Sequence, residues 1–91
     1  MLEIDFLNPA DKFLKRLPKK QKKQIVQKVL SLTIHPTPND SKILKGFPGY
    51  LRVDVGEYRV IYRFSQVLLT IVIVGKRNDD EVYRKFKRIF S

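Results

Sequence analysis

The stretch LRVDVGEYRVIYRF, residues 51–64, decides the fold of this chain. Two runs that alternate apolar and polar residues flank Gly56-Glu57, and glycine at the first central position is typical of a two-residue β-hairpin turn. Such a turn fixes the register in which the two strands pair. We therefore expect Asp54 to lie directly opposite Arg59.

The two faces of this hairpin differ in chemistry. Val53 and Val60 mark the face that we expect to pack on the core. The opposite face carries three arginines, namely Arg52, Arg59 and Arg63. A guanidinium beside apolar strands costs desolvation free energy unless it faces solvent, a carboxylate or an anionic ligand. Two interpretations follow for Arg59: an exposed cross-strand pair with Asp54, worth about 0.2–1 kcal/mol, or a phosphate-binding group.

The rest of the chain predicts an α+β fold. Alternation over residues 2–6 indicates a first strand. A short helix capped by Asn8 and a longer helix over residues 19–34 are expected to form an antiparallel pair on one side of the sheet. Residues 67–74, apolar on both faces, complete a three-stranded antiparallel meander, and a short helix ends the chain. We expect residues 1–91 to form a single domain with a four-stranded twisted sheet.

The charge balance indicates a polyanion as partner. Nineteen Lys and Arg against nine Asp and Glu give a formal net charge of +10. Such a field raises the local concentration of nucleic acid and speeds encounter with it. No apolar run reaches the roughly 18 residues of a membrane span, and no signal peptide is evident, so we expect a cytoplasmic protein without a membrane partner.

The usual catalytic sets are missing from the sequence. There is no cysteine, and the one histidine, His35, lies in a Pro-rich loop. The acidic run Asp79-Asp80-Glu81 is interpreted as the cap of the final helix rather than a metal cage, so we expect no metal or cofactor. RNA cleavage by such a chain would use attack of the RNA 2′-hydroxyl on the adjacent phosphate. Clustered cations would stabilise the charge on phosphorus and supply protons.

Several segments, taken in order, carry a resemblance to a known family. They are residues 51–63, the runs Val72-Ile73-Val74-Gly75-Lys76-Arg77 and Glu81-Val82-Tyr83, and the upstream Leu17-Pro18-Lys19-Lys20 and Leu44-Lys45-Gly46. In combination they resemble the RelE/ParE superfamily of toxins from type II toxin–antitoxin modules. The Gly-Lys-Arg loop followed by Glu-Val-Tyr is more similar to the RelE ribonucleases than to the ParE gyrase poisons. The resemblance implies metal-independent cleavage of messenger RNA in the ribosomal A site.

The resemblance also implies partners. A cognate RelB-like antitoxin is expected to neutralise the toxin in a heterodimer or heterotetramer, and ribosomal RNA is expected to contact it beside the messenger RNA. Charge complementarity favours an acidic, partly disordered antitoxin that folds across the basic groove. Two alternatives stay open: a ParE-like topoisomerase (gyrase) inhibitor without catalysis, and an RNA- or ribosome-binding module with weakened catalysis.

Position by position, the resemblance implies roles for four residues. Arg59 contacts the scissile phosphate, Arg77 protonates the leaving 5′-oxygen, and Tyr83 stacks on the substrate base. Arg52 falls near the family's basic pair, one member of which is taken as the general base. Further RNA contacts are expected from Lys45, Arg63, Lys76 and Arg84.

At the general base the sequence departs from the family. The neighbouring positions are Tyr50 and Asp54 rather than lysines. An arginine is a worse general base than a lysine because its pKa is far higher. Either another lysine, such as Lys45 or Lys76, serves as the base, or the catalytic rate is reduced, or this one role does not transfer.

Overall fold

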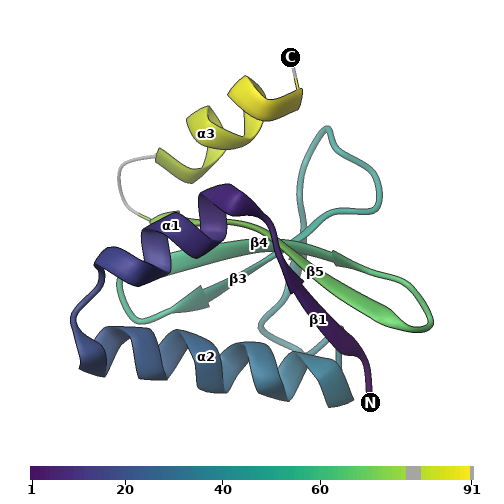
Figure 1. Ribbon diagram of the computed structural model, residues 1–91. Coiled ribbons are helices and arrows are strands. Elements are labelled where there is room, and N and C mark those ends of the chain that lie inside the picture. The colour runs from purple at the N-terminus through teal and green to yellow at the C-terminus, as the bar shows by residue number, and fades with distance from the viewer. Residues whose placement is uncertain (78–80, 91) are drawn as a thin grey trace.

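The computed structural model describes residues 1–77 and 81–90, which form one mixed sheet flanked by three helices (Figure 1). The strands are β1 (Glu3–Phe6), β2 (Lys42–Ile43), β3 (Leu51–Val55), β4 (Tyr58–Phe64) and β5 (Leu68–Lys76). The helices are α1 (Asn8–Arg16), α2 (Lys19–Ile34) and α3 (Glu81–Phe90). The sheet order is β1-β5-β4-β3-β2. The predicted α+β class and order of elements are confirmed.

β3 and β4 form the predicted hairpin. Their register pairs Val53 with Val60 and Asp54 with Arg59, as expected. Gly56 begins the turn with a φ of 58°, which glycine adopts without the steric penalty that a Cβ would bring. The turn therefore sets which side chains share a face along both strands.

Hydrophobic clusters cover both faces of the sheet. On one face, α1 and α2 pack against an apolar layer that includes Val53, Val60, Tyr62, Leu69, Ile71 and Val74. On the other face, α3 and the 44–50 loop cover a smaller cluster of Leu44, Ile61, Val72, Ile73, Val82 and Phe86. A bulge in β5 lets the consecutive residues Val72 and Ile73 both join this smaller cluster, since the register shifts beside Ile61.

The edges of the sheet differ from the four-stranded expectation. β1 pairs with β5 in parallel, and β2 adds a fifth strand antiparallel to β3. A strand of two residues is too short to show alternation in the sequence, and no tight turn fixes the direction of β1 relative to its partner. Leu7, rather than Asn8, occupies the cap position of α1, and no side chain caps this helix end. The cap predicted at Asp79 or Asp80 lies outside the described residues.

None of the helices in residues 1–77 and 81–90 combines the length and apolar character that a membrane crossing requires.

Candidate functional site

Arg59 lies at the centre of the candidate site, on the sheet face opposite α1 and α2. Its Nε donates a hydrogen bond to Asp54 Oδ1 (2.7 Å) and its Nη2 donates to Asp54 Oδ2 (3.3 Å). The Arg59 side chain is only 15% exposed. The hydrogen bonds from Arg59 lower the pKa of Asp54, and the same bonds raise the pKa of Arg59. Both groups are therefore ionised at neutral pH.

Tyr83 joins this pair from the first turn of α3. Arg59 Nη1 donates a hydrogen bond to Tyr83 Oη (3.2 Å), and the guanidinium carbon lies 5.7 Å from the ring centroid. The approach of α3 depends on Gly75, which lies opposite Arg59 in the pairing of β4 with β5. A Cβ at Gly75 would lie 2.9 Å from Val82 Cγ2, so either the Val82 side chain or α3 would have to shift. Gly75 therefore allows α3 to bring Tyr83 to Arg59.

Arg77 reaches the same carboxylate from the residue after β5. Its Nη1 lies 3.5 Å from Asp54 Oδ2, and its side chain is 51% exposed. The Arg77 backbone N–H donates to the carbonyl of Glu57 (3.0 Å), so the β3–β4 turn holds this residue in place. We call the contiguous set Asp54, Arg59, Arg77 and Tyr83 the arginine cluster.

A cavity of about 370 Å³ opens beside the arginine cluster. It is lined by Lys45, Phe47, Tyr83, Arg84 and Lys87. We call it the basic cavity. Tyr83 belongs to both regions, so three further cations and a second aromatic ring adjoin the cluster. Cations beside aromatic faces suit single-stranded RNA, in which phosphates and unstacked bases are accessible together.

The other predicted site residues lie at varying distances from the cluster. Arg52 is near enough to Asp54 for its charge to help lower the pKa of that carboxyl, after the larger effect of Arg59. Arg63 lies further along β4, with its guanidinium carbon 6.0 Å from the centroid of the Tyr50 ring. Lys76 is on the α1 side of the sheet, because it pairs with a residue of that face. Neither Arg63 nor Lys76 is brought into the arginine cluster.

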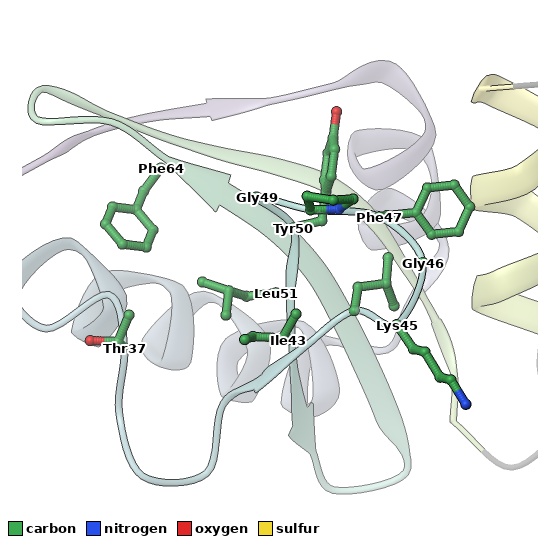
Figure 2. Close-up of a pocket in the computed structure, with 11 residues that line it drawn as sticks. Thr37, Ile43, Lys45, Gly46, Phe47, Gly49, Tyr50, Leu51 and Phe64 are labelled. Carbon is green, nitrogen blue, oxygen red and sulfur yellow. The ribbon is translucent and has the colours of Figure 1, made fainter.

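A larger hollow of about 690 Å³ lies on the other side of the 44–50 loop. Figure 2 shows Ile43, Leu51 and Phe64 around it, with Lys45 pointing away from it and Phe47 pointing toward α3. Ile43 is 74% exposed and Phe64 is 39% exposed. We call this hollow, beside the edge strand β2, the apolar groove. Exposed apolar surface of this kind typically marks a site of protein contact.

Sequence reasoning missed some residues of the site. Asp54 was interpreted as the partner in a surface pair and as a departure from the family's basic pair, although the predicted register already placed it opposite Arg59. Lys87 follows Tyr83 by four positions, so helical spacing could have placed both on one side of α3. Phe47 lies in a loop without periodicity and gave no signal.

The arrangement can stabilise negative charge. Two guanidinium groups meet at one carboxylate, and a phenol contacts one of them. Preorganised cations of this kind stabilise negative charge that develops in a transition state. Within residues 1–77 and 81–90, no three His, Cys, Asp or Glu side chains are grouped so as to hold a metal ion.

Comparison with known proteins identifies the family. Residues 4–81 match the model of the ParE toxin of the type II toxin–antitoxin system parDE. A double arginine-to-alanine mutant of the E. coli toxin RelE, in the free state, has a TM-score of 0.78 at 27% identity, over 94% of this chain and 95% of that chain. The isolated E. coli RelE toxin has a TM-score of 0.75 at 23% identity, over the full length of both chains.

An archaeal RelE–RelB complex from Pyrococcus horikoshii OT3 gives a TM-score of 0.73 at 24% identity, over 86% of this chain and 97% of that chain. No curated protein matches the sequence. The family model covers most of the chain, and the isolated E. coli RelE toxin shares its fold over the full length of both chains. The chain therefore belongs to the RelE/ParE superfamily, as a toxin of the type II toxin–antitoxin class.

Proposed function

We propose that this toxin is a metal-independent endoribonuclease that cleaves messenger RNA in the ribosomal A site. The observation that carries the proposal is the contact of Arg59 with both Asp54 and Tyr83, with Arg77 at the same carboxylate. Two cations and an aromatic ring thus meet at one point of a sheet face. The RelE ribonucleases that the sequence resembles use residues of these types at the matching positions.

In the proposed reaction the RNA supplies its own nucleophile. The 2′-oxygen attacks the adjacent phosphorus, the bond from phosphorus to the 5′-oxygen breaks, and the products are a 2′,3′-cyclic phosphate and a 5′-hydroxyl. Arg59 stabilises the charge that develops on the phosphate oxygens. Because Asp54 raises the pKa of Arg59, this residue acts as a permanent cation rather than as a proton donor. Arg77, which is half exposed, donates the proton to the leaving 5′-oxygen.

The remaining roles go to the basic cavity. Tyr83 stacks on the substrate base, a contact worth about 1–3 kcal/mol per base in single-stranded complexes. Lys45 lines the same cavity as Tyr83, which supports it over Lys76 as the general base that accepts the 2′-hydroxyl proton. Arg84 contacts a neighbouring phosphate of the messenger RNA, and ribosomal RNA contacts the remaining Lys and Arg side chains.

We extend the proposal to an antitoxin partner. E. coli RelE has been solved with a RelB peptide, and that toxin is 25% identical to this chain over 93% of each. The formal net charge of +10 favours an acidic, partly disordered partner, in a heterodimer or heterotetramer. An apolar segment of this antitoxin fills the apolar groove, beside an edge strand that can accept a further strand. The toxin acts in the cytoplasm, where ribosomes are.

The test is induced expression followed by mapping of messenger RNA 5′ ends. The proposal predicts cuts at a fixed phase within codons, and their loss in Arg77→Ala. Arg63→Ala is the matched control, because Arg63 is also an arginine of β4 but lies beside Tyr50, away from the cluster. Growth arrest without new 5′ ends would reject the proposal.

A ParE-like topoisomerase inhibitor is the second candidate, because the family model that matches residues 4–81 is that of a ParE toxin. Such a protein binds its target without catalysis. Toxicity would then survive both Arg59→Ala and Tyr83→Ala, and it would accompany DNA damage without loss of messenger RNA.

A further inference from the structure

We infer that the Asp54 carboxylate occupies the phosphate position of the arginine cluster in the free toxin, and that RNA must displace it. Asp54 would then be an internal competitor of the substrate. This inference rests on the proposed function, because it takes Arg59 and Arg77 as the groups that bind the scissile phosphate.

Arg59 uses all three of its guanidinium nitrogens within the chain. Nε and Nη2 form a two-bond fork to the oxygens of Asp54, and Nη1 donates to Tyr83 Oη. Carboxylates and phosphates compete for this same fork of a guanidinium, since both accept two parallel N–H bonds. With all three nitrogens engaged, an incoming phosphate gains full contact with Arg59 only when Asp54 releases it.

Arg77 lies at the same carboxylate as Arg59. Its Nη1 lies 3.5 Å from the Asp54 oxygen that accepts from Arg59 Nη2. Arg59 and Arg77 thus share the Asp54 carboxylate, in the arrangement that they would need to share a phosphate group. An ordinary cross-strand pair on a surface needs only one cation, and it leaves its arginine in solvent. Here the Arg59 side chain is 15% exposed.

The exchange needs only side-chain movement. Asp54 and Arg59 are held opposite each other by the backbone pairing of β3 with β4. Arg52 is already close enough to act on Asp54 by its charge, so a displaced carboxylate keeps a cation nearby.

This competition selects among anions. An isolated phosphate gains little, because it replaces an anion that is already well bound. A strand of RNA gains more, because it also brings a base to Tyr83 and phosphates to the cations of the basic cavity. The free toxin therefore discriminates against small anions and favours extended single-stranded RNA.

The test is Asp54→Asn, which removes the charge and keeps the shape. Asp11→Asn is the control, because it removes the same charge from an exposed pair with Lys15 on α1. The probe is a single-stranded 2′-O-methyl RNA oligonucleotide, which cannot be cleaved through its 2′-oxygen. Relative to the control, Asp54→Asn should bind it about 3- to 10-fold more tightly at low salt. Its slope of log affinity against log salt should steepen by about 0.7, the value for one added phosphate contact.

Equal or weaker binding by Asp54→Asn than by Asp11→Asn would overturn the inference. If Asp54→Asn fails to fold, Asp54→Ser carries the same expectation. Cleavage on ribosomes is measured separately for the wild type. Tighter binding by Asp54→Asn without cleavage by the wild type would reject the proposed ribonuclease and support the competitor. Cleavage by the wild type with no gain in binding would reject the competitor alone.

Discussion

The arginine cluster and the apolar groove lie on either side of the same 44–50 loop, yet they are built in opposite ways. In the cluster, each guanidinium nitrogen of Arg59 already has a partner within the chain. In the groove, Ile43 remains 74% exposed. The charged region is thus already paired within the chain, whereas the apolar region leaves surface that a partner could cover. Under the proposed function, RNA binds the first region and the antitoxin binds the second.

The largest expected effect is on the arginine cluster. Arg59→Ala should lower the rate of messenger RNA cleavage by about 100- to 1,000-fold, the usual loss when one preorganised donor to a transition state is removed. Single-turnover cleavage on purified ribosomes measures this rate. Arg63→Ala, from the same strand, should keep most of the activity. Equal losses in both variants would mean that the cluster has no special role.

The next effect separates the two regions. Ile43→Glu should weaken antitoxin binding by about 10- to 100-fold, since it places a charge where an apolar group is to be buried. Cleavage by the free toxin should not change. Titration calorimetry with the antitoxin provides the affinity, and Val67→Glu is the control because Val67 is 70% exposed outside the groove. A similar loss in both variants would show that the groove is not the contact.

A smaller effect divides the roles of Tyr83. Tyr83→Phe removes the oxygen that accepts from Arg59 Nη1 and keeps the ring, so the cleavage rate should fall by less than about tenfold. Tyr83→Ala also removes the stacking surface and should cost about 5- to 150-fold, from 1–3 kcal/mol of stacking. The same single-turnover assay measures both. If the two variants lose the same activity, the ring does not stack on the base.

The smallest effect concerns stability against pH. Hydrogen bonds from Arg59 lower the pKa of Asp54 in the folded state, so the ionised carboxylate stabilises the fold above its ordinary pKa of about 4. This contribution is lost as the pH falls through the lowered folded-state pKa. Asp54 is 34% exposed, so solvent screening limits the contribution to below about 1 kcal/mol, or a few degrees in Tm. Thermal melting should show wild type above Asp54→Asn at pH 6 and the difference narrowing toward pH 2. A constant difference would contradict this account.

The sequence predicted the parts of the fold and site that depend on short-range spacing. The Gly56-Glu57 turn sets the register that pairs Asp54 with Arg59, so the centre of the site followed from two strands and one turn. Strand alternation from that register also separates Lys76 from the cluster, although it was expected to join the RNA contacts.

The parts that could not be predicted depend on packing between distant segments. Nothing local indicates that Val82 packs against Gly75, where the absence of a Cβ allows α3 to lie close to the sheet. The apolar groove brings β2 and the 44–50 loop to Phe64 at the end of β4, and neither β2 nor the loop shows a period that a sequence pattern could reveal. The direction of β1 likewise follows from the layering of α1 and α2, not from a turn.

The most direct test of the central claim uses a messenger RNA with one 2′-deoxy nucleotide at the mapped cleavage position, programmed into purified ribosomes. The wild-type toxin should cut the all-ribose message and leave a 2′,3′-cyclic phosphate, and the single deoxy substitution should abolish that cut. Cleavage that persists at the deoxy position would contradict the claim that the arginine cluster works by stabilising attack of the RNA's own 2′-oxygen.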